Sequence, residues 1–464
     1  MSAAESPTDS AASAAIPASG PKLWRVGTLV YTTAGLIGLF CWLLWGDFGF
    51  FLKERAVQPT LQVLLKKFGA SDLVLALLVS SLPQAMSLVL MPIIGYRSDR
   101  YRSKWGRRIP FLAFTVPIAF TSMVGLAFSP VLGDLLHRAL GPSSPGVGPL
   151  VVGLLGLSWF VFEFSSLICG CLFHGLIADV VPQAVIGRFY AMFRVVGLFG
   201  NMVFAGLLLG HVEEYYFHIF LGIAFVYGLS FAVMCWRVKE GQYPEPDAVE
   251  VAAERQQWAI VTYLREAFTH PYYRWIFLAV SLGYVMTWPI SLFVYAYAPS
   301  IGMDLGTLGK YQTIQLMLSV VQAYPLGWLV DRFHALRVNL ATLALLFAAC
   351  VWAFFAVHDA TTLGIAIVAV GTLGGSWVTT MLPLGPTLFP QARFATLNSA
   401  MAICYSISQM IIAPVCGAML DRMNNDYRYM YYWAALMTAA TFVAMTVVYR
   451  RFRALGGPDR YVAP

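Results

Sequence analysis

Long apolar runs alternate with short polar segments along almost the whole chain. Twelve runs are long enough to cross a bilayer as helices, since a span takes about 20 residues at 1.5 Å per residue. We therefore predict an all-α membrane protein with twelve transmembrane helices in two six-helix bundles. The predicted spans are 33–67, 73–95, 109–130, 149–180, 189–210, 216–236, 273–298, 307–328, 338–357, 361–385, 395–419 and 429–449.

The length of the first span has two interpretations. Residues 26–52 already form a sufficient apolar run, so the charged residues 53–55 could simply mark its outer end. However, the second span fills residues 73–95, which places the preceding turn close to Gly69. We therefore favour one long first helix that continues to this turn.

A long first helix has three consequences. Thr33 would cap it after an extended lead-in, and Pro59 should bend it because proline removes a helical hydrogen bond. Counting back from the turn, Glu54 and Asp47 lie deep within the membrane. Such carboxylates are costly in lipid and should face a wet cavity or a partner.

A short motif, G-x-x-x-D-R, follows the second span and recurs half a chain length later. This spacing indicates a tandem duplication, and Pro182-Gln183-Ala184 is likewise echoed by Pro390-Gln391-Ala392. Charge pairs in such loops can hold one arrangement of two bundles and break in another, so we predict inner gates there. A bulky residue at Gly95 should slow turnover more than it weakens binding. The predicted gating residues are Gly95, Asp99, Arg100, Arg107, Arg108, Asp331 and Arg332.

Composition shifts divide the chain into five segments. Residues 1–25 are rich in Ser, Ala and Pro and should form a disordered cytoplasmic tail. The six-helix bundles cover 26–236 and 273–452. Between them, 237–272 should be a cytoplasmic linker whose amphipathic part lies on the membrane face, and 453–464 form a second cytoplasmic tail.

Composition and charge support a multi-pass membrane protein. Hydrophobic residues make up 59% of the chain and charged residues 11%, with a mean hydropathy of +0.69. Of the 30 Lys and Arg residues, 21 fall on the side of the termini. This bias predicts a cell (inner) membrane protein with both termini in the cytoplasm, and it explains the net charge of +7 without a nucleic-acid partner.

The chain lacks the sequence features of an enzyme or of a metal or cofactor site. Its seven cysteines lie in apolar runs without metal-ligand spacing. It has no phosphate-binding glycine loop and no nucleophile motif. We therefore expect no enzymatic activity, no cofactor and no metal.

Polar residues at helical spacing suggest a transport pathway in the first half. Asp47, Glu54, Gln58 and Gln62 share one face of the first span. Glu54 is the first choice for contact with a sugar hydroxyl or for protonation, and Asp47 is the second. The alternative is a static ion pair of Glu54 with Lys53, Arg55 or Arg194.

Two further spans of this half carry candidate coupling residues. Glu163, Ser166, Gly170 and His174 form one polar face, and Arg194 and Asn201 form another. Arg194 could pair with Glu163, Glu54 or Asp179 until a proton breaks the pair. His174 could titrate or serve as a fixed hydrogen-bonding group, and Asp179 could instead pair with arginines of the loop after the second span.

The second half offers neutral polar groups. Amides, hydroxyls and aromatic faces suit a sugar, which needs many hydrogen bonds and stacks its C–H face on rings. The alternative is that these amides hold helices together. The candidate residues are Gln315, Gln322, Tyr405 and Gln409, together with Gln312, Asn398, Trp288, Trp352 and Trp377.

The repeated G-x-x-x-D-R motif in a twelve-span chain resembles the major facilitator superfamily. Ser98 to Phe111, S-D-R-Y-R-S-K-W-G-R-R-I-P-F, is similar to the branch of glycoside-pentoside-hexuronide cation symporters and sucrose/proton symporters. Ile177-Ala178-Asp179 and Lys53-Glu54 also resemble motifs of that branch. Sodium-coupled members carry two aspartates in the second span, whereas this span has none, so the resemblance implies protons as the driving ion.

These observations together predict a proton-coupled symporter of a neutral sugar, such as a disaccharide or other glycoside, that works by alternating access as a monomer in the bilayer. One alternative is a cation-coupled lipid or lysolipid carrier, which the number of amides disfavours. Another is a non-transporting scaffold or sensor, which has little use for costly intramembrane charge.

Overall fold

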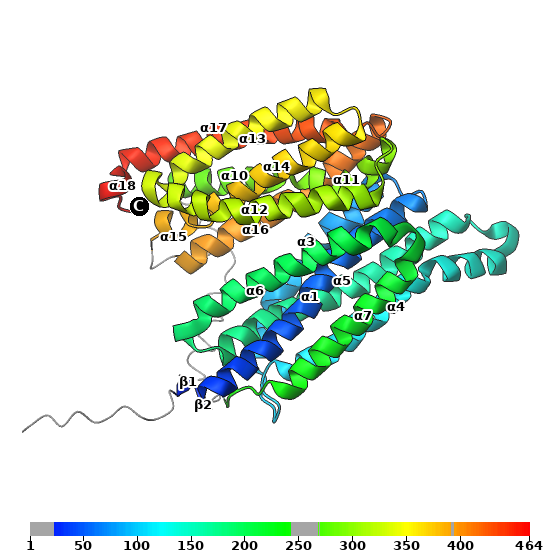
Figure 1. Ribbon diagram of the computed structural model, residues 1–464, viewed down its shortest axis with the longest axis horizontal. Coiled ribbons are helices and arrows are strands. Elements are labelled where there is room, and N and C mark those ends of the chain that lie inside the picture. The colour runs from blue at the N-terminus through cyan, green and yellow to red at the C-terminus, as the bar shows by residue number, and fades with distance from the viewer. Residues whose placement is uncertain (1–22, 243–267, 269, 391–393) are drawn as a thin grey trace, which may run out of the picture.

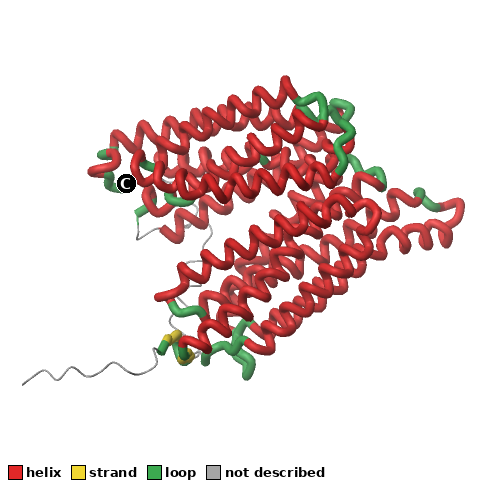
Figure 2. The backbone as a smooth tube through the Cα atoms, in the orientation of Figure 1, coloured by secondary structure: helices red, strands yellow, loops and turns green. Residues whose placement is uncertain are grey.

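The computed structural model describes residues 23–242, 268, 270–390 and 394–464. Helices dominate this part of the chain (Figure 2). It holds eleven runs that are long and apolar enough to cross a membrane, and one of them, Ala184–Arg237, has 54 residues, enough for two spans. The predicted all-α membrane fold is therefore confirmed.

The first bundle follows the predicted spans closely, with small differences in length. The second span contains a π-helical turn, η1, and the fifth ends in another, η3, before the chain turns into the sixth. Its elements are α1 (Thr33–Lys67), α2 (Asp72–Ala76), η1 (Leu77–Ser81), α3 (Leu82–Arg100), α4 (Ile109–Leu140), η2 (Gly141–Ser143), α5 (Val147–Val180), α6 (Gln183–Val203), η3 (Phe204–Leu208), η4 (Leu209–His211) and α7 (Val212–Arg237).

The second bundle has one broken span. Its first span divides at Thr287 into two helices, because Pro289 in the first turn of the second helix cannot donate a backbone hydrogen bond. The elements are α10 (Pro271–Met286), α11 (Trp288–Ser300), α12 (Leu305–Phe333), α13 (Ala335–Ala356), α14 (Ala360–Met381), α15 (Leu384–Leu388), α16 (Phe394–Arg422), α17 (Tyr429–Ala454) and α18 (Gly457–Arg460).

The two bundles touch at one end and diverge at the other (Figure 1). At the closed end α2 and η1 pack on α16, and η3 and η4 pack on α12. The C-terminus and the strands before α1 lie at the divergent end. We call the closed end the distal side and the divergent end the termini side.

The long form of the first span is correct, and the shorter alternative ending near residue 52 is wrong. α1 is continuous through Pro59 to Lys67. The predicted extended lead-in is a hairpin of β1 (Trp24–Val26) and β2 (Leu29–Tyr31). The predicted cap was misplaced by one residue, because the Thr32 hydroxyl, not that of Thr33, accepts the N–H of Gly35.

Three predictions concern segments that lie largely outside the described residues. The predicted disordered tail, 1–25, is described only from residue 23, and its last two residues, Trp24 and Arg25, belong to β1 instead. The amphipathic part of the linker, 249–268, is described only at its last residue. The second member of the Pro-Gln-Ala echo is described only at Pro390. The linker and the echo therefore stay predictions, and so does the tail over residues 1–22.

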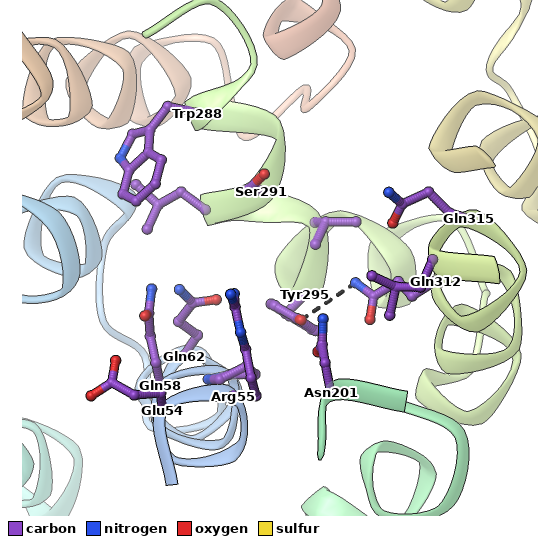
Figure 3. A pocket seen from close by; sticks show the side chains of 14 residues that line it. Glu54, Arg55, Gln58, Gln62, Asn201, Trp288, Ser291, Tyr295, Gln312 and Gln315 are labelled. Carbon is purple, nitrogen blue, oxygen red and sulfur yellow. Dashed lines mark hydrogen bonds between the residues drawn. The ribbon is translucent and has the colours of Figure 1, made fainter. Parts of the chain in front are cut away.

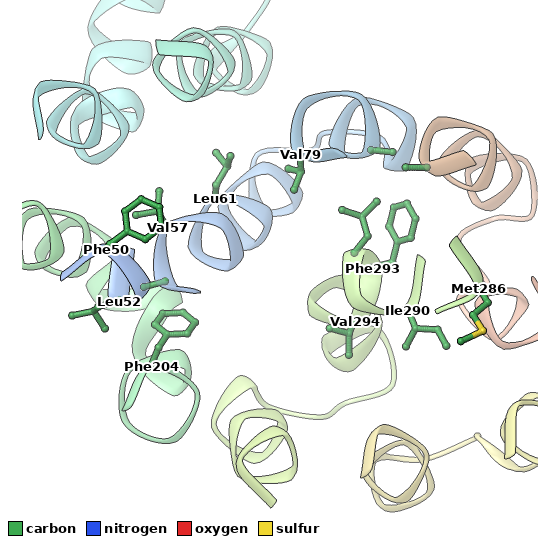
Figure 4. Close-up of a cluster of buried hydrophobic side chains, with 14 of the residues drawn as sticks. Phe50, Leu52, Val57, Leu61, Val79, Phe204, Met286, Ile290, Phe293 and Val294 are labelled. Atoms are coloured by element: carbon green, nitrogen blue, oxygen red, sulfur yellow. The ribbon is translucent and has the colours of Figure 1, made fainter. Parts of the chain in front are cut away.

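Apolar side chains of α1, η1, η3 and the broken span form a buried cluster (Figure 4). Val57 and Leu61 are inaccessible to solvent on α1, and Phe293 is equally buried on α11. Because these faces are packed, the polar residues of the same helices are directed elsewhere. This packing fixes the orientation of the site described below.

Asp304 caps α12 on the distal side, and this cap can be tested. Its carboxylate accepts the N–H of Thr307 at 2.8 Å, and hydrogen bonding to Thr307 holds the pKa of Asp304 below its ordinary value. We expect Asp304→Ala to lower the free energy of unfolding by about 1 kcal/mol at neutral pH. A lowered pKa means that the carboxylate stabilises above its ordinary pKa and loses this effect as the pH falls through the folded value.

Thermal unfolding of the purified protein at neutral and acid pH measures this difference. Asp134→Ala is the control, because the Asp134 side chain is 44% exposed and its one ion pair with a described residue is with Arg138, one turn along α4. Surface pairs of this kind contribute well under about 1 kcal/mol. An Asp304→Ala effect no larger than the control, or one that persists at acid pH, would contradict the capping role.

Candidate substrate and ion site

A cavity of about 340 Å³ lies between the two bundles, next to the middle of α1. Figure 3 shows side chains of α1, α6, α11 and α12 that line it. Most of these side chains are polar. The lining residues are Glu54, Arg55, Gln58, Pro59, Gln62, Asn201, Trp288, Ser291, Leu292, Val294, Tyr295, Gln312, Gln315 and Leu316.

The cavity wall is rich in neutral hydrogen-bonding groups. Spacings of three and four residues place pairs of them on one face of α1, α11 and α12. Gln312 donates to the Tyr295 hydroxyl at 3.3 Å, which links α12 to α11. Seven residues that the sequence pointed to line the cavity, namely Glu54, Gln58, Gln62, Asn201, Trp288, Gln312 and Gln315, whereas Ser291 and Tyr295 were missed. An uncharged Ser or Tyr in an apolar run has no distinguishing pattern.

A charged cluster adjoins the cavity. Lys53 is fully buried, and its ammonium donates to Glu54 Oε1 at 2.7 Å and to the Ser166 hydroxyl. Ser166 in turn donates to the same Glu54 oxygen at 2.7 Å. The ammonium also lies 4.2 Å from the centre of the Phe50 ring. Lys53 is thus held by a carboxylate, a hydroxyl and an aromatic face, which together compensate for its burial.

Glu163 is a second carboxylate beside this cluster. It lies on α5, close enough for its charge to interact with those of Glu54 and Lys53. Within the described residues it forms no hydrogen bond and no ion pair. One buried ammonium therefore has two acidic neighbours, of which only Glu54 is bound to it in this structure.

Asp47 lies within α1, fully buried. Both of its carboxylate oxygens lack a hydrogen-bond partner among the described residues. The position inside the protein was predicted, but Asp47 does not line the cavity with Glu54. It is not part of the Lys53 cluster.

The predicted pairing of Arg194 with Glu163, Glu54 or Asp179 is wrong for this structure. Arg194 is exposed and forms no ion pair with a described residue. Glu54 pairs with Lys53, and Asp179 binds two loop arginines. Helical periodicity identified the polar face of each helix but not which faces meet.

Four other predicted residues are engaged away from the cavity. His174 donates from Nδ1 to the Gly170 carbonyl at 2.8 Å, and Gln322 donates to the Thr372 carbonyl at 2.9 Å. Tyr405 stacks on Tyr284 with ring centres 4.4 Å apart. Gln409 accepts from Gln84 across the bundle interface at 3.1 Å. His174 thus fits the alternative of a fixed hydrogen-bonding group, and Gln322 and Gln409 fit the alternative of amides that hold helices together.

Charged residues of the first G-x-x-x-D-R copy form a cluster on the termini side within the first bundle. The Asp179 carboxylate binds Arg107 and Arg108, each at 2.6 Å, and Arg108 also binds Asp99 at 2.8 Å. Glu240, just after α7, accepts backbone N–H groups at the start of α4. This cluster braces the loop between α3 and α4 against α5 and α7.

The motif glycines on the termini side face open space. A Cβ atom added to Gly95 or Gly327 would meet no atom within 4 Å. Arg100 and Arg332 lie at or near the ends of their helices, and Arg332 packs over Trp328 at 5.1 Å. The side chain of Asp331 lies outside the described part. No close approach of the bundles occurs at either predicted gate glycine.

The distal side, in contrast, is held shut by a network that the sequence analysis missed. The Asp421 carboxylate, from α16, accepts the backbone N–H groups of Asp72 and Leu73 at 2.8 and 2.9 Å. The Asp72 side chain binds Lys66 at 2.7 Å and accepts from the Tyr427 hydroxyl at 3.2 Å. Acidic groups are stabilised at a helix N-terminus such as that of α2. We call these five residues the distal latch.

A signal for the distal latch is present in the sequence. Gly417-Ala-Met-Leu-Asp421-Arg422 is a third G-x-x-x-D-R copy, located at the end of a span rather than in a termini-side loop. A Cβ atom on Gly417 would lie 2.6 Å from the backbone oxygen of Asp72, so only glycine permits this approach. Gly417 does not lie half a chain length from Gly95 or Gly327, because its copy follows a fifth span on the distal side.

Three further hydrogen bonds join the two bundles between the distal latch and the cavity. The Trp288 indole donates to Ser80 at 2.9 Å, and Ser81 donates to the Met410 carbonyl at 2.6 Å. The third is the amide pair of Gln84 and Gln409. The bundles are thus joined from the distal latch to the level of Gln84, and the molecule is closed on the distal side.

Comparisons with known proteins agree with this architecture. A sequence model of the Major Facilitator Superfamily matches residues 43–413. No curated protein sequence matches the chain.

Three solved structures show the same fold at low sequence identity. A bacterial homologue of the iron transporter ferroportin, in an inward-facing state, has a TM-score of 0.68 at 15% identity, covering 89% of this chain and 99% of its own. A bacterial homologue of the human lysosomal transporter Spinster has 0.65 at 13%, covering 92% and 98%. The xylose transporter XylE from E. coli, inward open, has 0.64 at 15%, covering 89% and 96%.

Proposed function

The chain belongs to the major facilitator superfamily of membrane transporters, and from this premise we propose that it is a secondary transporter coupling the movement of a sugar to that of a proton. The observation that carries the proposal is the juxtaposition of an amide- and hydroxyl-lined cavity with the cluster of Lys53, Glu54 and Ser166. The cavity supplies the hydrogen bonds a polyhydroxylated molecule needs. The cluster supplies groups that can exchange a proton.

Glu54 connects the two parts of the site. Its side chain is 40% exposed and lines the cavity, while one oxygen stays bound to Lys53 and Ser166. Protonation of Glu54 releases Lys53, which can then compensate the charge of Glu163. Substrate binding at the Glu54 side of the cavity is thereby linked to the protonation state of the cluster.

The interface between the two bundles is closed on the distal side and open on the termini side, which suggests how access alternates. In the present state the distal latch is closed and the gate glycines Gly95 and Gly327 are free of close contacts. In the opposite state the latch breaks, and the two glycines take up the close contacts at the termini side. Such rocking between two packed arrangements exposes one central site to each side in turn.

The orientation of the chain sets the direction of opening. Lys and Arg residues are concentrated on the termini side, which favours a cytoplasmic location for both termini. The state described here is then inward-facing. A symporter driven by the inward proton gradient of a cell carries its substrate inwards, so we propose an importer whose distal latch faces the outside of the cell.

A lipid carrier is the weaker alternative. Among the lining residues only Pro59, Leu292, Val294 and Leu316 have purely apolar side chains. A site for an acyl chain requires a larger apolar surface. The wall instead offers five amide side chains.

Sugar-induced proton uptake tests the proposal. Sucrose, maltose and other glycosides are added in turn to de-energised cells that produce the protein, and the external pH is recorded. We expect one class of sugar to cause alkalinisation and the response to be lost in Glu54→Gln. Glu214→Gln on α7 is the control, because that exposed side chain forms no hydrogen bond or ion pair with a described residue. Sugar uptake without a pH change would refute proton coupling.

A further inference from the structure

A second cavity, of about 750 Å³, lies on the distal side beside the distal latch. We propose that it is a regulatory site in which a neutral polyhydroxylated ligand, such as the sugar offered for transport, binds from the distal side and holds the latch shut. The proposal rests on the proposed sugar transport only for the identity of this ligand. The lining residues are Lys66, Ala296, Tyr297, Pro299, Ser300, Ile301, Val357, His358, Asn424, Asn425, Asp426, Tyr427 and Arg428.

A buried tyrosine in the wall points to a ligand. The Tyr297 side chain, on α11, is 2% exposed, and its hydroxyl has no hydrogen-bond partner among the described residues. Tyr297 lines the cavity, and the charges of Asp426 and Arg428 act on its hydroxyl. A buried hydroxyl without a partner is destabilising, so a ligand that pairs with it gains the free energy that the protein alone has lost.

The charges of the wall are paired, which favours a neutral ligand. Asp426 accepts two hydrogen bonds from the Arg428 guanidinium, at 3.0 and 2.8 Å, and Lys66 donates to Asp72 at 2.7 Å. Arg428 Nη1 also lies 3.5 Å from His358 Nδ1. An ionic ligand would have to displace one member of a pair, whereas hydroxyl groups can bind without breaking either.

The remaining polar groups of the wall suit a molecule with many hydroxyls. Asn424 and Asn425 are exposed and follow α16 in left-handed conformations, with φ of 53° and 59°. Ser300 donates to the Tyr297 carbonyl at 2.7 Å, so its hydroxyl oxygen can still accept a hydrogen bond. Amides and hydroxyls both donate and accept, as the hydroxyls of a sugar do.

The cavity is complete only while the distal latch is closed. Lys66 comes from the first bundle, and all other lining residues come from the second. Its ammonium lies 6.0 Å from the centre of the Tyr427 ring, and both Lys66 and the Tyr427 hydroxyl bind Asp72. When the latch breaks, Lys66 leaves with the first bundle and the wall divides. A ligand in this cavity therefore binds the closed state selectively and stabilises it.

Stabilising the closed state slows import. Each cycle has to reopen the distal side before the next sugar can enter. A ligand that binds only one of two states stabilises it by the factor 1 + [L]/Kd, where [L] is the ligand concentration. External sugar at a concentration equal to the Kd of this cavity should therefore slow reopening about twofold. Sugar drives transport at low concentration and inhibits it at high concentration.

The dependence of uptake on external sugar tests this site. Initial uptake of the radiolabelled sugar that causes alkalinisation is measured from far below to far above half-saturation. Tyr297→Phe removes only the hydroxyl, and Asn424→Gly removes the amide while glycine suits the left-handed backbone. Tyr431→Phe is the matched control, because the Tyr431 hydroxyl is also buried without a partner among the described residues but does not line this cavity.

In the wild type we expect the uptake rate to pass through a maximum and then to fall at least about twofold at the highest concentrations. Tyr297→Phe and Asn424→Gly should shift this fall to concentrations about three to ten times higher, the loss expected for one hydrogen bond. The half-saturation constant of the rising phase should not change. Tyr431→Phe should behave as the wild type does.

The outcomes separate this proposal from the proposed function. A wild-type rate that only saturates, or a fall that is unchanged in Tyr297→Phe and Asn424→Gly, would overturn the regulatory site and leave sugar transport standing. If no sugar is taken up, the proposed function fails, and calorimetric titration of the purified proteins with the same sugars decides the role of the cavity. Binding that is weakened in Tyr297→Phe but not in Tyr431→Phe would uphold the site, and no binding or no difference would overturn it.

Discussion

Replacing Gly417 with leucine is expected to abolish accumulation of substrate. The Cβ atom alone would lie 2.6 Å from the backbone oxygen of Asp72, a contact that neither backbone can relieve without separating the bundles. The distal latch then cannot close, and the transporter stays open to the distal side. We expect uptake to fall at least about tenfold, because only the closed arrangement exposes the site to the termini side.

Chemical labelling can show the trapped state. A cysteine at Gln312, in a background without the natural cysteines, should react with a membrane-impermeant thiol reagent from the distal side in Gly417→Leu but not in the parent. Gly222→Leu is the matched control, since a side chain there meets no atom within 4 Å. Normal uptake by Gly417→Leu, or unchanged labelling, would show that the latch glycine does not control closure.

The second large effect is expected at Lys53. Lys53→Met removes the buried cation that compensates Glu54, and breaking a buried pair from one side costs about 3–5 kcal/mol. We expect a loss of stability near the lower end of this range, because Glu54 also faces the cavity, together with loss of proton-driven accumulation. The double variant Lys53→Met/Glu54→Gln should recover most of the stability but none of the coupling.

Thermal unfolding and substrate accumulation measured side by side separate these two effects. Lys67→Met, at the exposed end of α1, controls for the loss of a lysine from the same helix. Additive destabilisation in the double variant would mean that Lys53 and Glu54 act independently. If the double variant accumulated substrate as the wild type does, Lys53 and Glu54 would not take part in proton coupling.

The apolar periodicity was sufficient to predict most of the fold. Bilayer thickness fixes the minimum length of each span, so counting residues located the helices and extended α1 to the turn near Gly69. Boundaries differed where helices project beyond the apolar run, as α4 does to Leu140. The apolar runs contain no information about that projection.

The candidate site was less predictable than the fold. A seven-residue spacing put Asp47 and Glu54 on one face of α1, yet only Glu54 reaches the cavity, because at the level of Asp47, two turns away, Gly46 and Gly49 pack against α7. The interbundle contacts of Trp288 and Gln409 depend on how two independently folded bundles approach one another. Such contacts join residues hundreds of positions apart and have no local pattern.

The three G-x-x-x-D-R copies also bear on the ancestry of the chain. Gly327 and Gly417 begin two copies within one bundle, on opposite faces of the membrane, after its second and fifth spans. Near the end of the fifth span of the first bundle, Gly210 also meets the partner bundle closely, at Gly306. This order is that of a three-helix unit inserted twice per bundle in opposite orientations. A shared origin in such a unit accounts for the presence of the motif on both faces of the membrane.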